Sequence, residues 1–283
     1  MRSGFVAIVG RPNVGKSSIV NAIVGSKVSI VSDKPQTTRR RIHGVAAKGE
    51  AQVVFVDTPG LHKPVSALGE RVNSTALASS QDVDIVVLVF DASAGFGKGD
   101  EWVAQNVSVD RAGTKFFVVA NKCDGLSGEA VLRELQKSSV LGADEYFPLS
   151  ARTGQGLAEL VDVLFSAVPE GPWFYPEGAT HDLSDEEWVA ELVREELLRI
   201  TRDELPYSIA TRVTEWEWPR VRCEIVVERE SQKGMVIGKG GRVLKEVGEA
   251  VRRQMAEGAY LELRVVVDKD WQRKPARIER LGY

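Results

Sequence analysis

The sequence predicts an α/β domain with a mostly parallel sheet and helices on both faces, followed by a smaller α+β domain. Three observations support this prediction. From residue 5 to residue 165, continuously apolar segments alternate with helix-length stretches, as in parallel strands that are buried on both faces. A proline-rich stretch follows, and beyond it the pattern changes to the order α-β-β-α-α-β. The 283 residues are also enough for two separate cores.

Four apolar segments are expected as strands of the first domain. They are residues 5–9, 53–56, 85–90 and 116–120. Asp57, Asp91 and Asn121 directly follow the last three. Because open parallel sheets bind ligands beyond the carboxyl ends of their strands, these side chains are expected near a ligand.

The proline-rich stretch contains Pro169, Pro172 and Pro176 and marks the boundary between the domains. The expected bounds are 1–170 for the first domain, 171–182 for a linker and 183–283 for the second domain. In the second domain, Ser184 and the three acids after it predict an N-capped helix. Its other expected elements are strands at 207–216, 221–228 and 260–267, and a helix pair with a glycine-rich turn within 232–257.

Composition places the chain among ordinary globular proteins, with 43% hydrophobic and 27% charged residues. No apolar run is long enough for a membrane span or a signal peptide. Cys123 and Cys223 form no CxxC pair, which argues against structural zinc and for a reducing cytoplasm. The net charge is −3, yet residues 229–253 hold seven Lys and Arg against three acids, so a local basic face is expected.

A phosphate-binding loop is predicted where the first strand meets the first helix, because the sequence there fits GxxxxGK[ST]. Its residues are Gly10, Arg11, Pro12, Asn13, Val14, Gly15, Lys16 and Ser17. Backbone N–H groups of such a loop close around phosphate oxygens, Lys16 adds charge at the β and γ phosphates, and Ser17 can bind Mg²⁺. The alternative is a glycine-rich turn without a ligand.

Two further segments in the expected order make that alternative unattractive. The first comprises Asp57, Thr58, Pro59, Gly60 and Leu61. In such a fold an Asp at this strand end holds Mg²⁺ through a water molecule, and the glycine N–H contacts the γ-phosphate. The second comprises Asn121, Lys122, Cys123 and Asp124, with Ser150 and Ala151 further along. The Asp124 carboxylate can accept both N–H groups of guanine, whereas adenine would leave it unpaired. The backbone N–H groups at Ser150 and Ala151 are expected to face the guanine carbonyl. We therefore expect GTP as the nucleotide.

These segments resemble the motifs of the translation-factor-like class of small GTPases. The resemblance implies a switch I segment made of Gln36, Thr37, Thr38, Arg39 and Arg40. It implies that Thr38, with Thr37 as the fallback, binds Mg²⁺ in the GTP state beside Ser17 and the water-linked Asp57. It also implies a K⁺ ion at Asn13 in the role of an arginine finger, a simple phosphate-loop contact being the alternative.

Leu61 stands where signalling GTPases carry the Gln that orients the attacking water. An apolar side chain cannot hydrogen-bond, so slow intrinsic hydrolysis is expected. His62 is a weaker candidate for contact with that water, because an exposed loop histidine is more often incidental.

A Gly-x-x-Gly loop between two helices predicts a KH domain, which clamps about four nucleotides of single-stranded RNA. Its expected RNA-binding residues are Lys233, Met235, Ile237, Gly238, Lys239, Gly240, Gly241 and Arg242. The basic residues supply counter-charge, and the apolar ones lie beside the bases. The alternative is a helix-to-helix turn with a glycine cap, and the order of the elements argues against it.

Over essentially its whole length the chain resembles the Era family of bacterial GTPases, which join an α/β P-loop GTPase domain to a type II KH domain. The resemblance implies Mg²⁺ and GTP or GDP as ligands, and a role in maturing the 30S ribosomal subunit through the 3′ end of 16S rRNA. It further implies a cytoplasmic protein with peripheral association to the inner face of the cell membrane. We expect a monomer that binds no DNA. The alternatives are a tRNA-modifying or metabolic GTPase, for which no extra catalytic domain is visible, and a passive RNA-binding module, which the intact nucleotide motifs disfavour.

Overall fold

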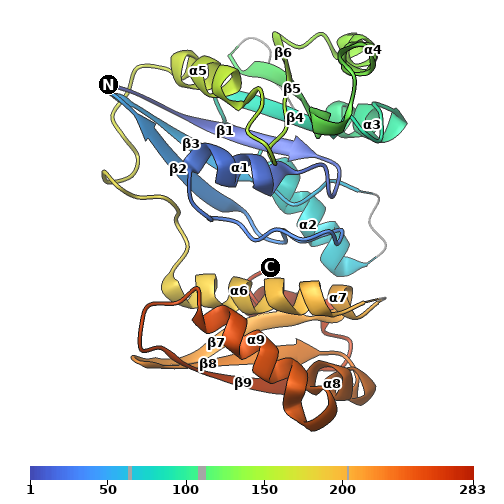
Figure 1. The fold of residues 1–283 in the computed structure, drawn as a ribbon, viewed down its shortest axis with the longest axis vertical. Coiled ribbons are helices and arrows are strands. Elements are labelled where there is room, and N and C mark those ends of the chain that lie inside the picture. Colours follow the sequence, from blue (N-terminus) through green and yellow to red (C-terminus); the bar gives the residue numbers. More distant parts are fainter. Residues whose placement is uncertain (63–65, 108–112, 203) are drawn as a thin grey trace. The chain divides into compact units, whose positions relative to one another are not determined.

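The computed structural model describes the whole chain except residues 63–65, 108–112 and 203 (Figure 1). The chain forms two compact units, of which the first takes most of residues 1–182 and the second holds Leu183–Tyr283. Among the described residues, no helix is both long enough and apolar enough to cross a membrane.

A six-stranded sheet forms the centre of the first unit, in the order β2-β3-β1-β4-β5-β6. Only the pair β2 and β3 is antiparallel, so the expected mostly parallel sheet is confirmed. The strands are β1 (Arg2–Gly10), β2 (Ile42–Lys48), β3 (Ala51–Asp57), β4 (Ile85–Asp91), β5 (Lys115–Asn121) and β6 (Glu145–Pro148).

Helices cover both faces of this sheet, which explains why the strands are continuously apolar (Figure 1). Successive side chains of a strand point to opposite faces, so Ile8 packs in one core and Val9 in the other. α1 and α5 pack on the first face, and α2, α3 and α4 pack on the second. These helices are α1 (Lys16–Val24), α2 (Ala67–Ala78), α3 (Lys98–Asn106), α4 (Gly128–Ser138) and α5 (Leu157–Ala167).

Two strands of the first unit were not expected from the sequence. β2 contains Gly44 and two alanines, which have weak strand propensity, and it forms by pairing along its whole length with β3. β6 has only four residues and lies at the edge of the sheet, where short strands are common.

The stretch from 171 to 182, expected as a linker, makes specific contacts within the first unit. Trp173 donates from Nε1 to the carbonyl of Glu50 over 3.2 Å. The Gln52 side chain accepts from the backbone N–H of Phe174 and of Tyr175 and donates to the carbonyl of Tyr175. This stretch therefore packs along the hairpin formed by β2 and β3.

The second unit packs helices on a three-stranded sheet in the order β7-β8-β9, with β8 and β9 parallel. Its strands are β7 (Ala210–Glu217), β8 (Arg220–Val227) and β9 (Tyr260–Val267). Its helices are α6 (Asp185–Ile200), α7 (Leu205–Ser208), α8 (Glu230–Ile237), α9 (Arg242–Arg252) and α10 (Pro275–Arg280). Ser184 caps α6 and forms a reciprocal capping box with Glu187, as the sequence pattern indicates.

The second unit departs from the expected elements chiefly in three features. The strand expected from residue 207 begins at Ala210, because Leu205–Ser208 forms a helical turn, α7, and its second residue, Pro206, is tolerated in the first turn of a helix. The second helix of the pair ends at Arg252 rather than near residue 257. α10 was not expected, and its first residue is a proline.

The core of the second unit should depend strongly on Ile225, which is fully buried on the central strand β8. Ile225→Ala should lower the free energy of unfolding by about 2–5 kcal/mol, because it removes apolar contacts and leaves a cavity. Ile225→Val should cost only about 0.5–1.5 kcal/mol. Urea unfolding followed by circular dichroism measures both, and equal losses would contradict this assignment of the core.

Candidate nucleotide and RNA sites

The phosphate-binding loop connects β1 to α1 at the carboxyl edge of the parallel strands. Lys16 is buried in it, and its Nζ donates to the carbonyls of Gly10 over 3.2 Å and of Arg11 over 2.9 Å. Burial lowers the pKa of Lys16 to about 8, although the nearby Asp57 carboxylate acts in the opposite direction. The loop thus holds one cation among backbone groups, as a phosphate site requires.

Ser17, Thr38 and Asp57 bring three oxygen-bearing side chains together. Ser17 Oγ donates to Asp57 Oδ2 over 2.7 Å and lies 3.0 Å from Thr38 Oγ1. Burial raises the pKa of Asp57, and the hydrogen bond from Ser17 offsets this in part. The other carboxylate oxygen, Oδ1, is buried and makes no well-formed hydrogen bond among the described residues, although the Ser29 hydroxyl is close enough to help lower the pKa of Asp57. Hard oxygen ligands with a spare buried carboxylate oxygen fit Mg²⁺.

Of the two candidate switch threonines, Thr38 is the one that lies beside Ser17. Its side chain is buried. The Thr37 hydroxyl instead donates to the carbonyl of Lys34 over 2.7 Å and lies 2.6 Å from Ser32 Oγ. In the same segment Arg39 is buried, while Gln36 and Arg40 are half-buried.

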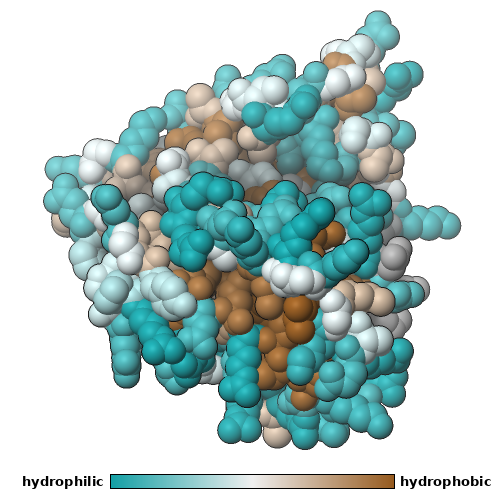
Figure 2. Space-filling view, turned by 60° about the horizontal axis from the view of Figure 1, so that its bottom comes forward, coloured by the Kyte–Doolittle hydropathy of each residue, from teal (hydrophilic) through white to brown (hydrophobic). Residues whose placement is uncertain are grey.

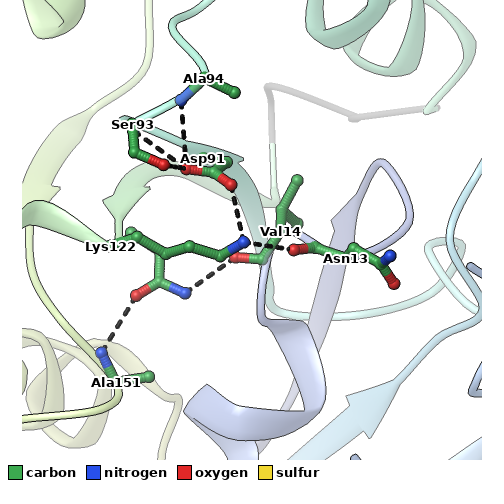
Figure 3. A network of polar contacts seen from close by, with 8 residues as sticks. Asn13, Val14, Asp91, Ser93, Ala94, Lys122 and Ala151 are labelled. Carbon is green, nitrogen blue, oxygen red and sulfur yellow. Dashed lines mark hydrogen bonds and ion pairs between the residues drawn. The ribbon is translucent and has the colours of Figure 1, made fainter. Parts of the chain in front are cut away.

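The Asn121 side chain joins the phosphate-binding loop to the loop after β6, through hydrogen bonds to Val14 and Ala151, both of which are labelled in Figure 3. Its Nδ2 donates to the carbonyl of Val14 over 2.8 Å, and its Oδ1 accepts from the backbone N–H of Ala151 over 3.0 Å. A Cβ atom on Gly15 would come within 2.2 Å of Asn121 Nδ2, so only glycine permits this approach.

Asp124 lies beside this junction and accepts hydrogen bonds from Ser150 Oγ, over 2.6 Å, and from the Arg152 guanidinium. Both hydrogen bonds lower the pKa of Asp124, so it is ionised at neutral pH and able to accept N–H donors. A cavity of about 990 Å³ borders Asp124, Asn121, Lys122 and Gly15, which is room enough for a nucleotide. Arg152 was missed from the sequence, although it directly follows the expected Ser150 and Ala151.

Three of the expected residues can offer a nucleotide only their backbone or no contact at all. Cys123 is buried in the core, where its Sγ donates to the carbonyl of Ala120 over 3.1 Å. The Leu61 side chain is 1% exposed and packs in the same core, while its N–H donates to the carbonyl of Gly10. Thr58 is buried and donates from Oγ1 to the carbonyl of Ile8 over 2.7 Å.

The glycine loop of the second unit joins α8 to α9. At Gly238 φ is +72°, and a Cβ atom there would lie 2.5 Å from Val243 Cγ2, so a side chain at Gly238 would disturb the helix pair. At Gly240, where φ is +61°, a Cβ atom would meet nothing within 4 Å. This tip is therefore open to a ligand's backbone.

The side chains around the loop combine charge with exposed apolar surface. Lys239 and Arg242 are exposed, Lys233 and Ile237 are half-buried, and Met235 is 62% exposed. Figure 2, turned so that the bottom of the Figure 1 view comes forward, shows that this face of the molecule carries an apolar area bordered by hydrophilic side chains. Such a combination suits single-stranded nucleic acid. The residues expected in the phosphate-binding loop and around the base thus lie in the first unit, and those expected to bind RNA lie in the second.

Two family profiles match the chain. The profile described as 50S ribosome-binding GTPase matches residues 5–122, and the KH domain profile matches residues 204–272.

Curated relatives match the full chain. The GTPase Era of Mycobacterium sp. strain JLS is 44% identical, over 100% of this chain and 99% of its own. The GTPase Era of Heliobacterium modesticaldum is 42% identical, over 100% and 97%.

Two solved Era structures are similar to this chain over its full length. A complex of Era with MgGDPNP and nucleotides 1506–1542 of 16S ribosomal RNA is 37% identical, with a TM-score of 0.95 over 100% of this chain and 99% of that one. An Aquifex aeolicus Era variant bound to GDP and AlF4⁻ has a TM-score of 0.94 at 37% identity and the same coverage.

Lys16→Ala should abolish binding of guanine nucleotides, because it removes the buried cation of the phosphate-binding loop. Fluorescent GDP titration measures the loss. Lys115→Ala, an exposed lysine at the start of β5, is the matched control and should bind like the unaltered protein. Unchanged GDP affinity in Lys16→Ala would refute the phosphate assignment.

Asp124→Asn should weaken GDP binding about a hundredfold, because guanine loses its pair of hydrogen bonds to a carboxylate. It should also favour xanthine nucleotides, since an amide can donate to the xanthine C2 carbonyl and accept from N1–H. Competition between GDP and XDP measures the exchange. Retained selectivity for guanine would move the base site elsewhere.

Proposed function

The chain belongs to the Era family of GTPases, and from that premise we propose that it is an RNA-binding switch driven by GTP. It hydrolyses GTP to GDP and phosphate, binds the 3′ end of 16S rRNA, and acts in the assembly of the 30S ribosomal subunit. The observation that carries this proposal is that one chain holds both the Ser17, Thr38 and Asp57 cluster and the open Gly-x-x-Gly loop. A relative with 16S rRNA and a GTP analogue aligns over the full chain, which supports the same function.

In the proposed nucleotide site, the backbone of residues 10–17 and the Lys16 ammonium hold the phosphates. The Asp124 carboxylate reads guanine, and Asn121 fixes the two loops that enclose it. Ser17, Thr38 and, through water, Asp57 would hold Mg²⁺, which neutralises charge that develops on the phosphate oxygens. We assign K⁺, where it binds, to Asn13.

Hydrolysis is proposed to be slow without an activating partner. A water molecule attacks the γ-phosphorus and the bond to the oxygen that bridges the β and γ phosphates breaks. Lys16 and the loop amides stabilise the charge that develops in this step. The water must be oriented by something other than residue 61, because the Leu61 side chain is apolar and lies in the core.

Thr38 offers the means of switching. Its Oγ1 lies 3.0 Å from Ser17 Oγ, and the switch I segment leads from it toward β2, which begins at Ile42. Contact between Thr38 and a Mg²⁺–GTP pair orders this segment, and loss of the γ-phosphate releases it.

We keep the bounds 1–170, 171–182 and 183–283 as the proposed domains and linker, and the separation of contacts at Leu183 supports the last of them. The proposed partner places the protein in the cytoplasm, where 30S subunits are assembled. Peripheral association with the cell membrane stays a prediction of the family resemblance.

Gly240 gives the cleanest test of the RNA clamp, because a side chain there meets nothing within 4 Å. Gly240→Asp should weaken binding of an RNA that copies the 16S 3′ end at least tenfold, since it places a negative charge beside the phosphates. Gly240→Asn has the same size and the same left-handed backbone without the charge, and should bind much more tightly than the Asp variant. Filter binding at one fixed salt concentration measures both.

Hydrolysis of GTP in the absence of RNA should be the same in both Gly240 variants, because the nucleotide site lies in the first unit. Full RNA affinity in Gly240→Asp would remove the loop from the RNA site.

A further inference from the structure

Lys122 connects the base side of the nucleotide site with the phosphate side (Figure 3). Its Nζ donates to the carbonyl of Asn13 over 2.7 Å and to Asp91 Oδ2 over 2.6 Å. The Lys122 side chain also borders the cavity that contains Asp124. Lys122 has a positive φ of 65°, so its backbone turns sharply where β5 ends.

Asp91 is held rigidly on the neighbouring strand. Asp91, the last residue of β4, lies opposite Asn121, the last residue of β5. Lys122 is the next residue after Asn121, so it lies diagonally across from Asp91. Its Oδ1 accepts from the Ser93 N–H over 2.9 Å, from Ser93 Oγ over 2.6 Å and from the Ala94 N–H over 3.3 Å. The second oxygen, Oδ2, is thereby aimed at Lys122.

The charges favour this arrangement. Partial burial raises the pKa of Asp91, but the hydrogen bonds from Lys122 and Ser93 outweigh it, and the pKa lies below its usual value. The Asp91 side chain is only 18% exposed and that of Lys122 is 41% exposed. A charge-assisted hydrogen bond at such a site is stronger than a surface ion pair.

The geometry points to Asp91 as a positioning residue of the nucleotide site: its carboxylate holds the Lys122 ammonium against the Asn13 carbonyl and so ties the base-binding loop to the phosphate-binding loop. This inference rests on the nucleotide-binding function proposed above. Lys122 lines the cavity beside Asp124 and Asp91 is not among its described lining residues, so Asp91 is assigned a role through Lys122.

Asp91 should therefore contribute to nucleotide affinity without contributing to the choice of base. Asp124 reads the guanine amine and makes no contact with Asp91 among the described contacts. Loss of Asp91 should therefore weaken the binding of GDP and of IDP by the same factor. Removal of Asp124 should instead weaken guanine nucleotides more than inosine nucleotides, since inosine lacks the 2-amino group.

The test measures dissociation rates of fluorescent GDP and IDP from the full chain with Mg²⁺. Asp91→Asn keeps an acceptor for Ser93 and Ala94 but removes the charge that holds Lys122. It should accelerate dissociation of both nucleotides about tenfold and leave their ratio unchanged. Asp162→Asn is the matched control, because Asp162 pairs with Lys48 on the exposed surface of the same unit, 2.5 Å apart. It should behave like the unaltered protein.

A double-mutant cycle with Lys122→Met decides whether Asp91 acts through Lys122. In the Lys122→Met background, Asp91→Asn should change the GDP dissociation rate less than about twofold. A tenfold effect in both backgrounds, an unchanged rate in the single variant, or a changed ratio of GDP to IDP would each overturn the inference.

A second Asp91 variant and a control on the unaltered protein separate failure of this inference from failure of the proposed function. Should Asp91→Asn lose its fold, as judged by circular dichroism, Asp91→Ser carries the same test, because it retains a hydroxyl acceptor without the carboxylate. Failure of the unaltered protein to retain GDP would refute the proposed function itself. Normal GDP retention in both the unaltered protein and the Asp91 variants would refute only the role of Asp91.

Discussion

The nucleotide site depends on one buried side chain, the amide of Asn121. It donates to the carbonyl of Val14 in the phosphate-binding loop and accepts from the N–H of Ala151 beyond β6. Along the chain, Val14 is 107 residues from Asn121 and Ala151 is 30 residues from it. The parallel sheet brings all three residues to one edge. Gly15 must lack a side chain for this contact to form. The phosphate side and the base side are therefore built as one rigid frame.

Around that frame, charged groups are placed by short polar contacts. Lys16 is held by two carbonyls, Asp57 by Ser17, and Asp124 by Ser150 and Arg152. The second unit differs: its Gly-x-x-Gly loop is open, and the glycines at 240 and 241 leave space at the tip beside the exposed Lys239 side chain. A site with fixed charged groups suits a small charged nucleotide, whereas an open glycine tip suits the backbone of a long polymer.

Much of the site could be predicted from the sequence because its elements are local. The phosphate-binding loop, the residues after β3 and those after β5 each carry their pattern within a few positions. Thr38 was chosen over Thr37 on the family resemblance, because adjacent residues of one type differ only in where the backbone aims them; the structure has Thr38 beside Ser17 and Thr37 bonded to Lys34. Arg152 and the bond between Asp91 and Lys122 were also beyond local reasoning, because each partner lies on another strand or loop.

The same limit explains the differences in the fold. β2 is a strand because β3 pairs with it, and its own residues give little signal. The contacts of residues 173–175 with Glu50 and Gln52 join positions more than 120 residues apart. Local composition at 171–182 indicated only a proline-rich connection, which is why a plain linker was expected there.

The central claim is that nucleotide state controls RNA binding in one chain. The most direct measurement is a titration of the full chain with a labelled RNA that copies the 16S 3′ end, at one fixed salt concentration, first with GDP and then with a non-hydrolysable GTP analogue. Binding should be tighter with the analogue. Equal affinity in the two states would contradict it, because the GTPase and the RNA-binding loop would then work independently.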